Sequence, residues 1–216
     1  MTPQSPAVGP TRAVPSSILS GVLYAFDVDG TLVKPFIRDE PCERCHGKRR
    51  VPIVDNWERL QTGGSSDAPC PDCVARYDTV ELLPGRAGAL WRLTEDPVAR
   101  FALVTNQAGV AFGYQTMAQV GEKLARVALA CEFFYARPFS IHIAVGHPKA
   151  KIIEYRDPLL VARRKPAPTM LEEAIARHGV TADGTVFVGD MDSDRECAAA
   201  AGVEYVDASE FFGSTS

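Results

Sequence analysis

Residues 26–32 read Phe-Asp-Val-Asp-Gly-Thr-Leu and continue an apolar run at 22–26 that is rich in β-branched and aromatic side chains. Such a run predicts a buried strand that ends at an Asp-rich turn. In extended backbone, residues i and i+2 point to the same side, so Asp27 and Asp29 can face one ligand. Gly30 would let the chain turn sharply directly after them. The alternative interpretation is an ordinary Asp-Gly turn at the surface.

The rest of the chain alternates between short apolar runs and amphipathic stretches. Further strands are predicted at 101–104, 141–145, 186–188 and 205–206, and helices at 85–95, 116–136, 169–178 and 193–201. This alternation predicts an α/β fold with a doubly wound, Rossmann-like parallel sheet. Such sheets bind ligands at the carboxyl ends of their strands, which is where the two aspartates are expected to lie.

Helix boundaries are predicted from capping patterns. Capping-box spacing is found at three pairs, Thr116 with Gln119, Thr169 with Glu172, and Ser193 with Glu196. Each pair predicts that a helix starts at its hydroxyl residue. Gly179 and Gly202 are placed to end the last two helices.

The composition and net charge indicate a globular protein and argue against some classes of partner. The 216 residues are 46% hydrophobic, enough for one sizeable core, and the net charge of −4 argues against bulk electrostatic coating of nucleic acid. We see no apolar run long enough for a membrane span and no signal-peptide pattern, so we expect a cytoplasmic protein without a membrane partner. Residues 1–20 are rich in Pro, Ser and Thr and predict a flexible N-terminal tail.

The two neighbouring carboxylates suggest a particular chemistry. They repel each other unless a cation or a proton lies between them. A divalent metal would relieve this repulsion and leave Asp27 ionised as a nucleophile. Asp29 could then hold or release a proton as a general acid and base.

The 26–32 stretch resembles the first motif of the haloacid-dehalogenase-like (HAD) superfamily of hydrolases. Three further stretches are similar to its other motifs, in the right order: Val104-Thr105-Asn106-Gln107, Arg164-Lys165-Pro166, and Val188-Gly189-Asp190-Met191-Asp192-Ser193-Asp194. The resemblance covers about residues 21–33 and 81–210. Four motifs in the right order, each at the proper strand end, are more specific than any single one.

The resemblance implies a phosphatase with assigned catalytic residues. Asp27 would attack phosphorus and form an aspartyl-phosphate, and Asp29 would protonate the leaving alcohol and then activate water. The Thr105 hydroxyl would donate to a phosphoryl oxygen. Lys165 would neutralise the nucleophile and the transferred group.

The resemblance also implies a Mg²⁺ site. Asp27, the backbone carbonyl of Asp29, and Asp190 would bind the ion. Asp194 would support either the metal site or Lys165.

Within the superfamily, the sequence resembles subfamily IIIA most. This branch contains histidinol-phosphate and heptose-bisphosphate phosphatases, and the polynucleotide 3′-phosphatases are similar to it. The resemblance is carried by Asn106-Gln107-Ala108-Gly109 and by residues 164–170, Arg-Lys-Pro-Ala-Pro-Thr-Met. Asn106 and Arg164 are the candidate substrate-binding residues, although Arg164 could instead be solvated. The sugar-phosphate members usually carry a zinc loop after the third strand, where this chain has Gly146-His147-Pro148-Lys149 and no cysteine.

Cysteine pairs lie elsewhere, in a stretch at 34–80 that interrupts the pattern. Cys42, Cys45, Cys70 and Cys73 form two C-x-x-C knuckles, which favour a structural Zn²⁺ with four thiolates. Free thiols, a redox pair or disulfides are the alternatives. We therefore predict a core at 21–33 and 81–213 with an inserted zinc-binding module, similar to a zinc ribbon, at 34–80.

Three functions follow as hypotheses. The first is a Mg²⁺-dependent phosphomonoesterase that acts on a small phosphorylated metabolite. The second is a polynucleotide 3′-phosphatase whose zinc module binds the nucleic-acid end. The third is a non-catalytic zinc-ribbon binding protein on the same scaffold. The sequence predicts no oligomeric state.

Overall fold

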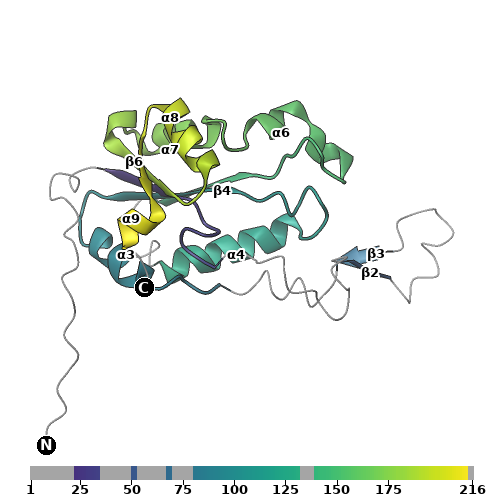
Figure 1. Cartoon of the computed structure of the whole chain (residues 1–216), viewed down its shortest axis with the longest axis horizontal. Coiled ribbons are helices and arrows are strands. Elements are labelled where there is room, and N and C mark those ends of the chain that lie inside the picture. The colour runs from purple at the N-terminus through teal and green to yellow at the C-terminus, as the bar shows by residue number, and fades with distance from the viewer. Residues whose placement is uncertain (1–21, 35–49, 53–66, 70–79, 132–138, 214–216) are drawn as a thin grey trace, which may run out of the picture.

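A five-stranded parallel sheet forms the centre of the protein, as a computed structural model shows (Figure 1). The structure describes residues 22–34, 50–52, 67–69, 80–131 and 139–213. The strands are β1 Leu23–Phe26, β4 Arg100–Asn106, β5 Phe139–Ala144, β6 Thr185–Gly189 and β7 Glu204–Asp207. Their order, β5-β4-β1-β6-β7, confirms the predicted doubly wound α/β fold, with β1 in the middle.

Helices cover both faces of this sheet (Figure 1). On one face lie α3 Arg86–Thr94, α4 Met117–Ala130 and α9 Ala208–Phe212. On the other face lie α7 Thr169–His178 and α8 Asp192–Ala201. Shorter helical segments are η2 Ile153–Arg156, α6 Pro158–Ala162 and η3 Ala182–Gly184.

Strand β1 is buried on both faces, which explains its unbroken apolar sequence. Tyr24 and Phe26 pack in the layer of α3, α4 and α9, whereas Leu23 and Ala25 pack against α7 and α8. All four side chains are fully buried. The strand is thereby fixed on both sides, and it presents Asp27 at its carboxyl end.

Most of the predicted helix boundaries are confirmed, but two of the three predicted capping boxes are wrong. Thr116 forms the capping box with Gln119, and the left-handed glycines Gly179 (φ 63°) and Gly202 (φ 67°) end α7 and α8. The boxes at Thr169 and Ser193 do not form. Helix α7 starts at Thr169 without a side-chain cap. Helix α8 starts at Asp192, because the Asp194 carboxylate accepts the backbone N–H of Met191 at 3.1 Å.

The two segments that flank the stretch at 34–80 contact each other in the core. The Lys34 backbone N–H donates to the Glu81 carbonyl at 3.2 Å, and Val33 pairs with Leu82. Within the stretch, β2 Arg50–Pro52 and β3 Asp67–Pro69 form an antiparallel pair. The four predicted zinc ligands, Cys42, Cys45, Cys70 and Cys73, lie outside the described residues, as do the predicted tail at 1–20 and the end of the predicted helix at 116–136.

No helix among the described residues combines the length and apolarity needed to cross a bilayer.

A buried polar network joins β5 to α7. The Ser140 hydroxyl lies 3.0 Å from His142 Nε2 and 2.9 Å from His178 Nε2. His142 Nδ1 lies 3.3 Å from a carboxylate oxygen of Glu173, which also pairs with Arg163. Burial lowers the pKa of both imidazoles, although Glu173 opposes this at His142. The histidines are therefore neutral and structural near pH 7.

We expect acid to weaken this network. Because the folded protein lowers the pKa of His178, the unfolded chain takes up the proton first as the pH falls below about 6.5. The histidine's contribution to the free energy of unfolding is therefore present above that pH. Below it, this contribution falls by at most about 1.4 kcal/mol per pH unit. Urea unfolding of the wild type and His178→Gln between pH 7.5 and pH 5 measures this. The stability difference should shrink toward low pH, and a constant difference would contradict the account.

Candidate active site

Four segments bring charged side chains to the carboxyl edge of the sheet. Asp27 follows β1, Asp190 follows β6, Asp194 lies in the first turn of α8, and Lys165 lies between α6 and α7. The Lys165 ammonium contacts Asp27 Oδ1 at 2.5 Å and Asp194 Oδ1 at 2.6 Å. Oxygens of Asp27, Asp190 and Asp194 all lie within 4.8 Å of one another. The predicted motifs therefore meet in one cluster.

Burial dominates the electrostatics of this cluster. Asp27 is 6% exposed, and desolvation raises its pKa to about 7, against the lowering effect of Lys165. Asp194 and Asp29 raise it further by repulsion. Desolvation alone would lower the pKa of Lys165, but the two carboxylates outweigh it and raise that pKa. Lys165 is therefore an ammonium, and the cluster has an excess of negative charge that favours a further cation.

Asp190 is held against the turn that follows β1. The Thr31 hydroxyl donates to Asp190 Oδ1 at 2.9 Å. Gly30 has a φ of 96°, and a Cβ atom there would lie 2.3 Å from Asp190 Oδ2. A glycine is thus required at this position both for the turn and for the close approach of the carboxylate.

The three grouped carboxylates fit a magnesium ion. Carboxylate oxygens are the ligands that Mg²⁺ uses in proteins, and it commonly keeps several waters. Asp190 is exposed, so solvent can reach one side of the group. The Asp29 side chain is not in this group, since its oxygens contact other residues. Its role through the backbone carbonyl stays a prediction.

Thr105 and Asn106 end β4 beside Lys165. Thr105 is 1% exposed, and its hydroxyl accepts a hydrogen bond from Gln107 Nε2 at 2.9 Å. The Asn106 amide donates to the Lys165 carbonyl at 3.2 Å and accepts the Lys165 backbone N–H at 3.0 Å. Asn106 thus fixes the loop that carries Lys165, and its predicted contact with substrate stays a prediction.

Arg164 has an unpaired nitrogen. Its Nη1 is buried without a hydrogen-bond partner among the residues that the structure describes. Burial also lowers the pKa of its guanidinium. A buried N–H group without an acceptor costs free energy, and an anionic ligand would relieve that cost.

Similarity to known proteins agrees with this geometry. Residues 162–206, which include Lys165, Asp190 and Asp194, match the HAD-hydrolase-like family model. The fold resembles D,D-heptose 1,7-bisphosphate phosphatase from B. bronchiseptica in complex with magnesium and phosphate, with a TM-score of 0.57 and 23% identity over 85% of this chain and 78% of that chain. Residues 162–206 are therefore similar to HAD-like hydrolases, and the chain as a whole has the fold of the solved phosphatase.

A second solved structure is similar to this chain. It is a candidate HAD-like phosphatase from Mesorhizobium loti, with a TM-score of 0.50 and 19% identity over 90% of this chain and 73% of that chain. No curated protein matches the chain. At these identities the two solved structures establish the fold.

Three residues of the candidate site have no role in the sequence-based prediction. Lys123 of α4 and Gln107 contact the Asp29 carboxylate at 2.5 Å and 2.8 Å. Arg86 of α3 donates from Nε to the Thr31 carbonyl at 3.0 Å and so supports the turn after β1. Lys123 does leave a signal in the sequence, because it lies on the apolar stripe of its helix beside Val120 and Leu124. A lysine on a buried face needs a charged partner.

Proposed function

We propose that this protein is an HAD-like hydrolase, a Mg²⁺-dependent phosphomonoesterase that forms an aspartyl-phosphate on Asp27 and acts on a small phosphorylated metabolite. One observation carries the proposal. The Lys165 ammonium lies between Asp27 Oδ1 and Asp194 Oδ1, within a carboxylate group that also contains Asp190. A buried nucleophile, a fixed cation and a set of oxygen ligands are what phosphoryl transfer requires.

The first half of the reaction transfers the phosphoryl group. An oxygen of Asp27 forms a bond to phosphorus while the bond to the ester oxygen breaks, and Asp29 gives its proton to that oxygen. Lys165 balances charge on the transferred group, and the Thr105 hydroxyl can donate to it. Asp27, Asp190 and Asp194 would hold Mg²⁺, which when bound supplies positive charge to the phosphoryl oxygens and keeps Asp27 ionised.

The second half restores the protein. A water molecule attacks phosphorus, and Asp29, now a carboxylate, takes its proton. Inorganic phosphate leaves and the Asp27 carboxylate is free again. One carboxyl group thus serves as acid and then as base, and it ends each cycle protonated, as it began.

Two observations support a small metabolite as substrate. The unpaired Nη1 of Arg164 offers a contact for a second anionic group, which a phosphorylated metabolite often carries. The similar structure from B. bronchiseptica is a phosphatase of a heptose bisphosphate. We therefore expect a substrate with an anionic body.

A substrate panel tests the proposal. Phosphorylated metabolites and 3′-phosphorylated oligonucleotides are compared with Mg²⁺ and with a chelator in its place. We expect phosphate release from metabolites alone, abolished by the chelator. Release from oligonucleotides alone would favour a polynucleotide 3′-phosphatase. No release from any substrate, together with tight binding of nucleic acid or protein, would favour the non-catalytic alternative.

We also propose that Cys42, Cys45, Cys70 and Cys73 bind one structural Zn²⁺. The β2–β3 pairing supports this, because Arg50 lies opposite Pro69. The chain therefore enters β2 at the same end of the hairpin at which it leaves β3. One cysteine pair precedes β2 and the other begins directly after β3 in the sequence.

We expect the purified protein to contain about one Zn²⁺ per chain. Cys42→Ser should lose the metal and destabilise the insertion, because metal binding supplies folding free energy to a segment with little core of its own. Metal analysis by mass spectrometry measures the content. Cys197→Ala is the matched control, since Cys197 is buried between α8 and the sheet, and it should keep the zinc. Zinc-free protein with four titratable thiols would contradict the site.

A further inference from the structure

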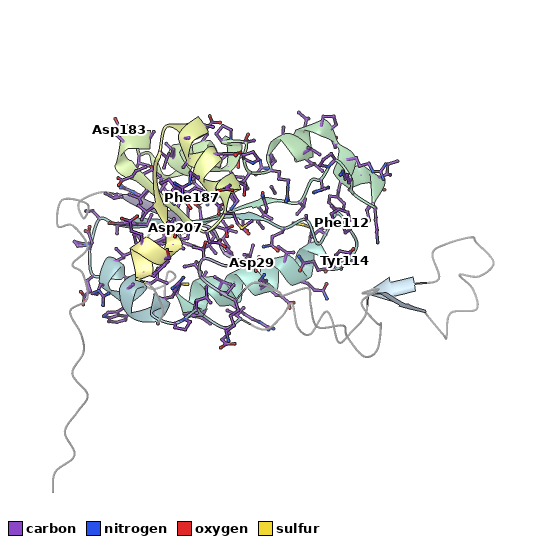
Figure 2. The ribbon with its side chains drawn as sticks, in the orientation of Figure 1. Asp29, Phe112, Tyr114, Asp183, Phe187 and Asp207 are labelled. Carbon is purple, nitrogen blue, oxygen red and sulfur yellow. The ribbon has the colours of Figure 1, made fainter. Side chains whose placement is uncertain are left out.

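The Asp29 carboxylate is held at both of its oxygens. Lys123 Nζ lies 2.5 Å from Oδ1, and Gln107 Nε2 donates to Oδ2 at 2.8 Å. The Asp29 side chain is still 30% exposed. Each carboxylate oxygen has two acceptor positions, so each has room for one further proton or hydrogen bond. Asp29 is thus fixed from one side and open on the other, and in Figure 2 it lies beside α4.

Lys123 is buried where an apolar residue would be expected. Its side chain is only 7% exposed, and its neighbours on the stripe, Val120, Leu124 and Val127, are fully buried. Burial of an ammonium group costs several kcal/mol unless it is paired. The pair that it makes joins residues 94 positions apart in the sequence, one on α4 and one on the loop after β1.

Gln107 is fixed by a chain of hydrogen bonds. Its Nε2 donates to Asp29 and to the Thr105 hydroxyl, and its Oε1 accepts from Gln115 Nε2 at 3.2 Å. A Cβ atom at Gly109 would lie 2.6 Å from that Gln115 nitrogen, so a glycine there makes room for the contact. The amide of Gln107 is thereby oriented with its N–H groups toward Asp29 and Thr105.

We propose that Lys123, assisted by Gln107, is a positioning residue for Asp29 that determines how well the protein cleaves phosphate esters whose leaving group needs a proton. The inference rests on the proposed phosphatase function. As the bond from phosphorus to the ester oxygen breaks, the proton passes from Asp29 to that oxygen. The negative charge left on Asp29 then faces the Lys123 ammonium and the Gln107 amide, which already point at it.

A positioning role makes the loss of activity depend on the leaving group of the substrate, whereas a purely structural role does not. An alkyl alcohol leaves phosphorus readily only when it is protonated, whereas 2,4-dinitrophenolate leaves as an anion. Misplacement of Asp29 should therefore slow the first class of substrate and spare the second. The parameter kcat/KM reports the steps up to the first irreversible one, here the phosphorylation of Asp27.

The experiment compares the wild type, Lys123→Met and Arg126→Met. Methionine keeps most of the length of the apolar stem and deletes the charge, and Arg126 is an exposed cation on the same helix. The substrates are glycerol phosphate, phenyl phosphate, 4-nitrophenyl phosphate and 2,4-dinitrophenyl phosphate. In Lys123→Met we expect kcat/KM to fall by about 30- to 100-fold for the first two and by less than about 3-fold for the last. Arg126→Met should resemble the wild type.

Two further variants separate an effect on Asp29 from an effect on folding. In an Asp29→Asn background, Lys123→Met should cause no further change that depends on the leaving group. Lys123→Gln, which is also uncharged, should show the same dependence if Lys123→Met folds poorly. Thermal melting measures the stability of each variant.

The outcomes separate the inference from the function on which it rests. An equal loss for all four substrates, no loss for any, or an undiminished effect in the Asp29→Asn background overturns the positioning role while phosphatase activity stands. A wild-type protein that hydrolyses neither these four substrates nor any member of the metabolite panel overturns the proposed function, and the role of Lys123 with it.

Discussion

Asp27→Asn is expected to lower kcat by at least about 10⁴-fold, the scale seen when a covalent nucleophile is removed. Asparagine has the shape of aspartate but lacks the anionic oxygen that attacks phosphorus in the proposed mechanism. It also removes one of the two carboxylates that contact Lys165. Release of 4-nitrophenol from 4-nitrophenyl phosphate in the presence of Mg²⁺ measures the effect.

A matched control for this variant is Asp183→Asn. Asp183 lies in η3, directly before β6, and so at the opposite edge of the sheet from the active site (Figure 2). It should retain wild-type kcat and KM. Activity of Asp27→Asn within tenfold of the wild type would show that the phosphoryl group is transferred elsewhere.

Lys165→Met is expected to have the next largest effect, a fall in kcat of about 10³-fold. In the proposed mechanism its ammonium stabilises charge that develops on the phosphoryl group, and loss of one such contact typically costs 10²- to 10³-fold. Lys165 also separates Asp27 from Asp194, so its loss adds repulsion around the nucleophile. Steady-state kinetics with saturating Mg²⁺ measures kcat.

Stability provides a second measurement on Lys165→Met. Removing one partner of a buried ion pair leaves unbalanced charge, which costs roughly 3 kcal/mol. We therefore expect a lower free energy of unfolding without metal and partial recovery with Mg²⁺, which replaces the missing positive charge. Lys34→Met is the control, because Lys34 is 54% exposed in its pair with Glu81, and such pairs contribute little. Equal kcat in the wild type and Lys165→Met would exclude the proposed role.

Local patterns in the sequence predict most of the sheet. Strands β1 and β6 are short apolar runs that end at polar residues or glycine, and the order of the motifs places Asp27, Asp190 and Lys165 at one edge. The structure confirms this fold. The prediction succeeds because β1 and β6 are buried on both faces, and such strands carry a continuous apolar signal.

Contacts between distant residues are what the sequence could not predict. The pairing of Asp29 with Lys123 depends on how α4 packs against the sheet, and only the position of a lysine on an apolar stripe indicates it. Asn106 looks like a substrate-facing residue at a strand end, but its amide binds the backbone of Lys165. The start of α8 is displaced because Asp194 caps the helix while it also pairs with Lys165.

The most direct test of the account is to trap the phosphorylated protein. Asp29→Asn is mixed with 2,4-dinitrophenyl phosphate and Mg²⁺, because the first step then needs no proton and the second step lacks its base. Acid quenching and peptide mass spectrometry locate the phosphoryl group. We expect it on Asp27, with loss on treatment with hydroxylamine. A phosphoryl group on any other residue, or none while the wild type turns over, would contradict the account.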